Sequence, residues 1–539
     1  MLRGGRGVCP RLTGLLAVNS ATTARLTAAR RAAPALLVLI CAAVAVETAI
    51  QPAVGAVLGA VACAAAITAA MTLGVRLPAV VWPALAVPGV AVTAMWPTAG
   101  VTIAAVLAIT VLAVREPPYA FVAALLMFGF EGSIKMRLTV EGAPHPLAIG
   151  AALIDLALVI SVLGLLWEDR GSSLRGVWDR FGRMERLVVW SLVAWVVLAV
   201  LQIPLGNSLS SGVSGLRLVH FYLIAIPGGM LLAARLPAER VAVLLMGMAV
   251  AIAAYAAFRG IVGNSEHERE FTRSRAEGTF LGKHQRDSGS FTSPIALASF
   301  AVPATVFGFA LAFMEVRQRV LGGVLFVLGL VGAIASYVRT ALIAVAAGAL
   351  ALAAILATGR GISRQMKLVA AGLAVIVLVG GYGATLLAGD VDPFAKHRAE
   401  SLSNPFGDYS LKERYKTWER TLKKVVHHPE GTGTGTVGRA TIKGSGRKAV
   451  FTDNSYLKIL QEQGFVGGFL FLFGVIAAVV LCWRRLVRIG PLSRPLGVAA
   501  LVAFVSFLVL CLTGEYVEQP GKAFVWAMLG ITAWEAYGR

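Results

Sequence analysis

Charged residues are scarce in this sequence. Asp, Glu, Lys and Arg make up 14% of its 539 residues, whereas hydrophobic residues make up 57%. Soluble globular domains carry about 25% charged residues, and disordered chains have low hydrophobicity. The shortage of charge therefore excludes both an ordinary soluble enzyme and a disordered protein.

Cysteine is also rare, with five residues in the whole chain. Cys41, Cys63, Cys482 and Cys511 lie within apolar runs, and Cys9 lies near the N-terminus. The sequence has no CxxC motif and no pairing pattern. It therefore predicts neither a disulfide framework nor a zinc site.

Long apolar runs are what the sequence has instead. Runs that approach the roughly 20 residues of a membrane-spanning helix begin near 32, 52, 78, 100, 117, 147, 187, 217, 238, 291, 320, 340, 366, 464, 496 and 521. We therefore predict an all-α polytopic membrane protein with about 14–16 transmembrane helices. Its expected parts are a basic cytoplasmic tail (1–31), an N-terminal transmembrane bundle (32–258), a first outer loop (259–290), central transmembrane helices (291–388), a large outer loop (389–454) and C-terminal transmembrane helices (455–539).

Acidic residues are fewer than basic residues, 28 against 49, which gives a formal net charge of +21. In a membrane protein, this excess positive charge must reside mainly in the loops. Arginine clusters mark the short loops at 170–186, 360–367 and 484–494, which the positive-inside rule assigns to the cytoplasm. The basic N-terminal tail lacks a clear cleavage site, so the run from 32 is expected to be a retained helix. With sixteen spans both termini are cytoplasmic. The loops 259–290 and 389–454 then face outward although they are basic, as a site for an anionic ligand would be.

The large outer loop contains a predicted helix. Leu411, Tyr415, Trp418, Leu422 and Val425 form an apolar stripe at helical spacing. This pattern fits a helix on the membrane surface or over the mouths of the spans. The alternative, which the pattern alone favours, is a solvated basic helix with a packing tryptophan.

A glycine-rich motif follows, with the sequence H-H-P-E-G-T-G-T-G from His427 to Gly435. Its glycines allow close backbone approach to a neighbour, either a ligand or simply the next segment of chain. The two histidines are candidate metal ligands, but adjacent side chains point apart and no acidic partner has metal spacing. No G-K-[ST] follows, so the motif is not a P-loop.

Three further sequences contain candidate functional residues. The motif R-x-x-G-[ST]-F occurs at Arg275 and again at Arg286, where it leads into a span. Ser336 to Thr340 reads S-Y-V-R-T, with Arg339 between two apolar runs, and such an arginine marks either a functional site or a snorkelling helix end. In F-T-D-N-S-Y-L, either Asp453 or Asn454 can cap the next helix. A carboxylate there can also orient or deprotonate a hydroxyl.

Taken together, these motifs resemble the bacterial O-antigen ligase and O-antigen polymerase family of lipid-linked glycan transferases. The features that carry the resemblance are R-x-x-G-S-F at Arg286, S-x-x-R-T at Ser336, R-x-x-x-W (Arg414 and Trp418), H-P-x-G-x-G at His428, D-N-S-Y-L and Q-G-x-x-G at Gln463. They cover residues 286–468, about a third of the chain.

The resemblance implies an all-helical fold of GT-C type in the bacterial cytoplasmic membrane. The implied donor is a glycan on undecaprenyl diphosphate, and the acceptor is a glycan or another hydroxyl. Membrane lipids surround the protein, and a flippase and a chain-length regulator are expected partners. No nucleic acid, nucleotide sugar, cofactor or metal is expected.

The resemblance also implies roles for single residues. Arg286, Arg339 and Arg414 are assigned to the diphosphate, whose oxygens suit the planar guanidinium, and Arg339 also to catalysis. Supporting positions are Trp418, His428, Asn454 and Tyr456.

One residue departs from the ligase pattern. Ligases commonly have a histidine where this chain has Asp453, and that histidine is thought to activate the acceptor hydroxyl. Aspartate looks more like the polymerase branch and remains a candidate base, with His427 and His428 as substitutes. The sequence leaves two alternatives open: a transporter with many spans, and a polysaccharide-assembly protein without turnover.

Overall fold

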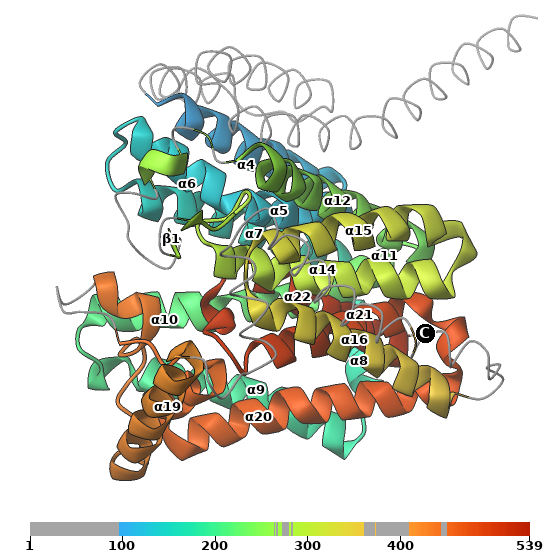
Figure 1. The fold of residues 1–539 in the computed structure, drawn as a ribbon. Helices are drawn as coiled ribbons and strands as arrows, with labels where there is room; N and C mark the ends of the chain where they lie inside the picture. The colour runs from blue at the N-terminus through green and yellow to red at the C-terminus, as the bar shows by residue number, and fades with distance from the viewer. Residues whose placement is uncertain are drawn as a thin grey trace, which may run out of the picture.

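The computed structural model describes residues 96–263, 265, 268–271, 280–281, 284–359, 372, 409–443 and 450–538. Nearly all of these residues are helical, as predicted, and the described strands are a two-residue antiparallel pair, β1 (Phe280–Leu281) and β2 (His284–Gln285) (Figure 1). The α-helices are α4 (Pro97–Arg115), α5 (Pro117–Gly129), α6 (Glu131–Val140), α7 (Pro146–Asp169), α8 (Ser172–Arg180), α9 (Arg183–Leu201), α10 (Leu209–Val219), α11 (Ala225–Arg235), α12 (Ala238–Val262), α14 (Pro294–Met314), α15 (Arg319–Ala335), α16 (Arg339–Thr358), α19 (Tyr409–His427), α20 (Ser455–Ile489), α21 (Pro495–Leu510) and α22 (Lys522–Tyr537). The 3₁₀ turns are η1 (Ile203–Leu205), η2 (Phe221–Ile224), η3 (Val316–Gln318), η5 (Gly438–Lys443), η6 (Pro491–Ser493) and η7 (Tyr516–Glu518).

Nine helical segments within the described residues are long and apolar enough to cross a membrane. A tenth span is formed if α5 and α6 count together, because they pass the same test as a pair bent by 56°. These segments and the shorter α21 and α22 match the expected spans from 100 onward, except that the helix expected near 464 begins at Ser455. The expected spans near 32, 52, 78 and 366 lie outside the described residues. The protein is an integral membrane protein.

Contacts between distant segments define one end of the bundle, here called the arginine-rich end. It comprises the C-terminal ends of α7, α11, α14, α20 and α22 and the starts of α9, α12, α15 and α21. The Arg180 guanidinium donates to the Tyr537 carbonyl (2.9 Å), and ion pairs join Arg235 to Asp169 (3.5 Å) and Arg494 to Glu535 (3.5 Å). The predicted basic loops 170–186 and 484–494 therefore share one face.

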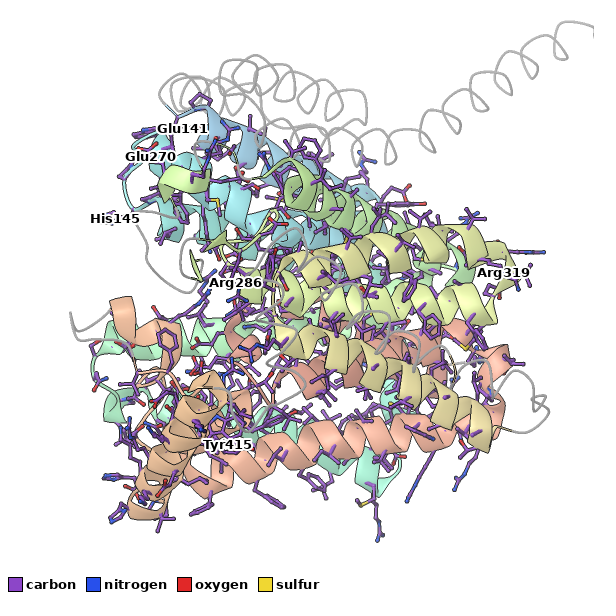
Figure 2. All side chains as sticks on the ribbon, in the orientation of Figure 1. Glu141, His145, Glu270, Arg286, Arg319 and Tyr415 are labelled. Carbon is purple, nitrogen blue, oxygen red and sulfur yellow. The ribbon has the colours of Figure 1, made fainter. Side chains whose placement is uncertain are left out.

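The opposite end, here called the loop end, comprises the segment before α14, the α15–α16 turn, α19, the start of α20 and the α21–α22 connection. Figure 2 shows Arg319 at one end of the bundle, with Arg286 and Tyr415 at the other. Every candidate site residue belongs to the loop end or to the first turns of the helices that leave it.

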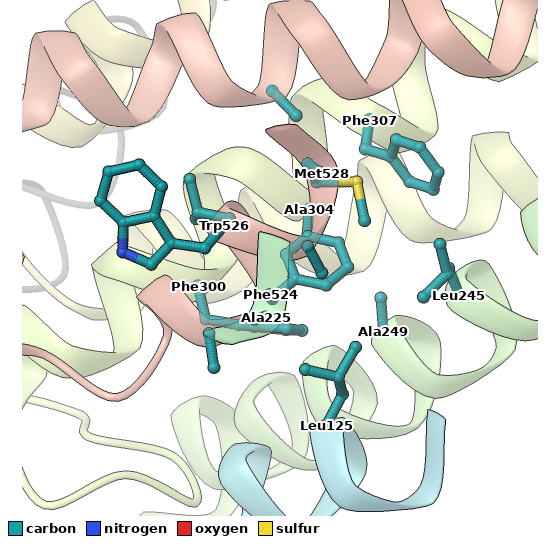
Figure 3. Close-up of a cluster of buried hydrophobic side chains, with 14 of the residues drawn as sticks. Leu125, Ala225, Leu245, Ala249, Phe300, Ala304, Phe307, Phe524, Trp526 and Met528 are labelled. Carbon is teal, nitrogen blue, oxygen red and sulfur yellow. The ribbon is translucent and has the colours of Figure 1, made fainter. Parts of the chain in front are cut away.

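Helix α14 lies at the centre of the bundle and is buried along most of its length. Phe300 and Phe307 of α14 pack on Phe524 of α22, with ring centroids 5.3 and 6.2 Å apart (Figure 3). Where α11 meets α22, a Cβ on Gly530 would lie 2.0 Å from the Ile226 carbonyl oxygen, so the two backbones require glycine there. This close packing fixes the helices whose ends build the site.

Candidate functional site

The turn between α15 and α16 brings two of the candidate arginines together. The Arg286 Nε donates to the Ser336 carbonyl (3.0 Å), and the backbone N–H of the next residue, Asp287, donates to the Ala335 carbonyl (3.3 Å). Arg339 follows three residues later as the first residue of α16. The R-x-x-G-S-F and S-x-x-R-T motifs are therefore one structural unit, although about fifty residues separate them.

The turn itself is tightly built. The Ser336 hydroxyl donates to the Ala333 carbonyl (2.6 Å) and accepts from the Val338 N–H (3.3 Å). Tyr337 adopts a left-handed backbone conformation with φ 51°, which a bulky residue rarely takes. The turn thus holds Arg339 at a fixed position beside Arg286.

The connection between α21 and α22 supports the other side of this turn. The Thr513 hydroxyl donates to the Thr340 hydroxyl (2.8 Å), and the buried Tyr516 hydroxyl is also hydrogen-bonded to Thr340. Burial raises the pKa of Tyr516 to about 12, while the hydrogen bond from Thr340 and the positive charges of Arg414 and Arg286 act to lower it. Arg414 of α19 and Arg286 therefore lie within electrostatic range of the same phenol.

Asp453 and Asn454 have different roles at the start of α20. The Asn454 carboxamide oxygen accepts from the N–H groups of Tyr456 (2.9 Å) and Leu457 (3.1 Å), and its nitrogen donates to the Leu512 carbonyl (2.8 Å). Asn454 is therefore the N-cap, and the cap leaves Asp453 unused. Asp453 is half-exposed with φ 50°, and its carboxylate makes no hydrogen bond or ion pair with another described residue. It can therefore receive a ligand.

Glu515 holds the chain just before Asp453. Its Oε1 accepts from the Thr452 N–H (2.6 Å) and hydroxyl (2.9 Å), and both residues are buried. Burial and the neighbouring Glu518 raise the pKa of Glu515 to about 8. The Ser455 hydroxyl adds a bond to the Gly514 carbonyl (2.7 Å). The α21–α22 connection therefore positions both Asp453 and the Arg339 turn.

A buried ion cluster lies beneath this connection. Lys458 Nζ lies 2.8 Å from Glu462 Oε1 and 2.9 Å from Glu518 Oε1, and all three side chains are fully or almost fully buried. Glu518 also accepts from the Arg439 N–H (2.9 Å), and the Arg439 guanidinium donates to the Ser293 hydroxyl (2.9 Å) at the N-cap of α14. The cluster joins α20, η5 and η7 to the start of α14.

The glycine-rich motif packs against a break in α20. Gly464 has φ 68° and ψ −170°, so residues 455–463 and 465–489 form two separate helical parts. A Cβ on Gly431 would lie 2.5 Å from the Glu462 carbonyl oxygen, and one on Gly464 would lie 2.2 Å from the Pro429 carbonyl oxygen. The N–H groups of Gly433 and Phe465 donate to the Glu462 and Pro429 carbonyls (both 2.9 Å). The glycines therefore allow close contact with protein backbone and do not form a ligand cradle.

A comparison with protein families identifies the domain that contains these motifs. Residues 324–472 match the model of the O-antigen ligase family. The chain carries an O-antigen ligase domain. The match confirms the resemblance that the motifs predicted, and it supports an O-antigen ligase-like function in general. No curated protein matches the chain.

The O-antigen ligase domain covers the end of α15, α16, α19, the glycine-rich motif and the start of α20. It contains Arg339, Arg414 and Asp453. Arg286, Glu515 and Tyr516 lie outside the matched residues, so the site extends beyond the domain on both sides.

The remaining candidates within the O-antigen ligase domain serve different purposes. Trp418 is half-buried on α19, four residues after Arg414, and packs edge-on against Tyr415 (5.4 Å). The Tyr456 hydroxyl donates to the Leu508 carbonyl (2.7 Å), which fixes the tyrosine between helices. Of the predicted apolar stripe on α19, Val425 is buried while Tyr415 and Leu422 are exposed.

The two histidines are exposed at the end of α19. His427 Nδ1 lies 2.7 Å from the Lys423 carbonyl oxygen and His428 Nδ1 lies 3.3 Å from Glu430 Oε1. Glu430 contacts the Gly464 break, which is about 15 Å along α20 from its start at a rise of 1.5 Å per residue. The structure therefore does not bring His428 to Asp453. Among the described residues, no group of three or more His, Cys, Asp and Glu is arranged to hold a metal ion.

Sequence reasoning missed Glu515, Tyr516 and Glu518. They lie in E-Y-V-E, a short polar interruption between the apolar runs of α21 and α22. Two carboxylates in so short a gap between two spans are themselves a signal of function or of buried pairing.

Proposed function

We propose that this protein is a glycosyltransferase that polymerises or transfers a glycan carried on undecaprenyl diphosphate at the outer face of the bacterial cytoplasmic membrane. The observation that carries the proposal is that Arg286 and Arg339 belong to the α15–α16 turn, and that Arg286 and Arg414 lie within electrostatic range of Tyr516, which contacts the same turn. Guanidinium groups suit phosphate oxygens and stabilise the charge of a diphosphate leaving group. The arginine-rich end would face the cytoplasm by the positive-inside rule.

In the proposed reaction, an acceptor hydroxyl attacks the anomeric carbon of the donor. The bond from this carbon to the diphosphate oxygen breaks, and undecaprenyl diphosphate leaves with the electron pair. Asp453 takes the hydroxyl proton, because its carboxylate is half-exposed and is not used by the helix cap. The three arginines bind the diphosphate and neutralise its developing charge.

The aspartate at position 453 favours the polymerase over the ligase. The gathering of polar groups at one end of the bundle favours an enzyme over a transporter, whose site normally lies near the bilayer midplane. A flippase that supplies the donor and a regulator of chain length are partners that this reaction would require.

The test is to delete the gene and to measure the size distribution of surface polysaccharide and of undecaprenyl-diphosphate-linked glycans. For a polymerase, single repeat units accumulate on the carrier and long chains disappear. For a ligase, long chains accumulate on the carrier. Unchanged pools of both would overturn the proposal.

Complementation with Asp453→Asn tests the base. We expect a loss of activity of roughly 10²-fold or more, in the range typical of a general base. Full activity of a variant that inserts and folds normally would remove Asp453 from the reaction and leave the protein without its proposed base.

A further inference from the structure

A polar cavity lies beside the α15–α16 turn. Its volume is about 410 Å³, which falls in the range of about 300–1,000 Å³ typical of small-molecule sites. It lies between the end of α12, the residues before α14 and the turn, and is lined by Arg259, Gly260, Arg269, Asp287, Ala335 and Tyr337 among others.

Asp287 gives this cavity an unused hydrogen-bond acceptor. Its side chain is only 7% exposed, and its Oδ1 accepts from the Gly289 N–H (2.8 Å). Among the described residues, its Oδ2 is buried and has no hydrogen-bond partner. Buried polar atoms without partners are rare because they cost free energy. A hydrogen-bond donor that enters the cavity would satisfy this oxygen.

The cations of the cavity do not supply that donor. The Arg259 Nη2 lies 3.2 Å from Glu268 Oε2, and its Nε donates to the Tyr255 hydroxyl (3.0 Å). Arg259 is therefore committed to Glu268 and Tyr255. Arg269, which is exposed, offers donors at the rim of the cavity.

These groups discriminate between ligands. A phosphate near neutral pH mainly accepts hydrogen bonds, so it leaves Asp287 unsatisfied and its charge is repelled by the carboxylate. A sugar hydroxyl both donates and accepts, so one sugar can donate to Asp287 and accept from Arg269. Tyr337, whose left-handed backbone is the strained position of the turn, adds an aromatic residue to the lining.

The cavity is also next to the proposed diphosphate site. Ala335 and Tyr337 line the cavity, and Ser336 between them accepts from Arg286. Asp287 directly follows Arg286 in the chain. One short turn therefore contributes both to the lining of the cavity and to the position of Arg286.

We propose that this cavity binds a neutral sugar residue, with a sugar hydroxyl donating to Asp287 and another accepting from Arg269. The inference rests on the proposed function in one respect, namely that the sugar belongs to the lipid-linked glycan. It assigns to Asp287 and Arg269 the recognition of sugar, separately from the recognition of diphosphate by Arg286 and Arg339.

The test uses the purified full-length protein in nanodiscs and saturation-transfer NMR with methyl glycosides of glucose, galactose, mannose, rhamnose and N-acetylglucosamine. We expect transfer to at least one glycoside, reduced at least tenfold in Asp287→Ala and Arg269→Ala. Glu270→Gln, which alters an exposed carboxylate beside Arg269, is the matched control and should bind normally.

A variant that fills the cavity tests the inference without removing a buried side chain. A Cβ on Gly260 would lie 3.6 Å from Asp287 Oδ2 and 3.1 Å from the Ala335 Cβ, so the hydroxyl of Gly260→Ser can reach that oxygen and occupy the cavity if Ala335 shifts by a few tenths of an ångström. We expect this variant to remain folded, as its melting curve will show, and to lose glycoside binding. Binding that survives Gly260→Ser and Asp287→Ala, or no transfer to any glycoside, would overturn the inference.

The outcome separates this inference from the proposed function. The assay contains no lipid carrier and no diphosphate, so Arg339→Ala should bind glycosides normally although it should fail in glycan assembly. If the deletion strain has unchanged glycan pools but the purified protein binds glycosides through Asp287, the cavity stands and the transferase proposal fails.

Discussion

Two ion pairs at opposite ends of the helix bundle differ sharply in their burial. At the arginine-rich end the Arg317–Glu239 pair has side chains that are 76% and 55% exposed, whereas at the loop end those of the Lys458–Glu518 pair are 0% exposed. Exposed basic residues can orient the protein without fixed partners. Buried charges must be matched in position, so they define local structure. The burial of each charged side chain therefore says more about its structural role than the total charge of the chain does.

Breaking a charge pair at each end should give the largest contrast. Lys458→Met leaves Glu462 and Glu518 buried without their cation, and we expect a loss of about 3–5 kcal/mol in the free energy of unfolding. Arg317→Ala should cost less than about 1 kcal/mol because its pair is solvated. Thermal unfolding in detergent measures both, and equal losses would contradict the contrast.

The second comparison concerns two arginines in equivalent positions. Arg339 is the first residue of α16 and Arg319 is the first residue of α15, at opposite ends of the bundle. We expect Arg339→Ala to lower glycan product at least 10²-fold, in the range of a lost electrostatic contact to a developing charge. Arg319→Ala should remain active when complementing the deletion strain. Similar losses in the two variants, at equal protein levels, would argue against a special role for Arg339.

Glu515 should make stability depend on pH. Its pKa is raised in the folded state to about 8 by burial and by Glu518, so the stability it contributes is full below its unfolded pKa and is lost as the pH rises through about 8. One group changes stability by at most about 1.4 kcal/mol per pH unit. Glu515→Gln should therefore unfold with about 1–3 kcal/mol less pH dependence between pH 6 and 8. An unchanged profile would show that Glu515 is not protonated in this range.

The smallest expected effect is on α19. Arg414 is half-buried and lies within electrostatic range of Tyr516, whereas Arg420 on the same helix is exposed. We expect Arg414→Ala to reduce product roughly tenfold, as for one charge-assisted hydrogen bond of about 1.4 kcal/mol. Arg420→Ala should have little effect. If the two variants reduce the product equally, general electrostatic attraction by α19 explains the data better than a defined contact.

Features that depend on short stretches of sequence could be predicted. Apolar runs of membrane-spanning length give the spans, and the R-x-x-G-S-F and S-x-x-R-T motifs point to Arg286 and Arg339. The sequence does not reveal that Arg286 hydrogen-bonds the turn before Arg339, because that contact depends on how α14, α15 and α16 pack.

Other features could not be predicted for the same reason. The helix break at Gly464 could not be predicted from the sequence, because it depends on the packing of Pro429 and Gly431 against α20. Glu515 and Tyr516 belong to no motif, and only the folded chain places them beside Thr452 and Thr340. The choice between Asp453 and Asn454 as cap required the positions of their side chains.

The break in α20 divides this helix into a short part near Asp453 and a long apolar part. Residues 465–489 span about 37 Å at a rise of 1.5 Å per residue, enough for the hydrocarbon core of about 30 Å without help from residues 455–463. Phe465, Val466 and Phe469, which are all exposed, follow the break directly and suit contact with acyl chains. The nine residues before the break are therefore not needed to cross the hydrocarbon, and Asp453 lies just before them. In the proposed reaction, this arrangement would let a water-soluble acceptor reach Asp453 from the aqueous side while the polyprenyl chain of the donor stays in the lipid.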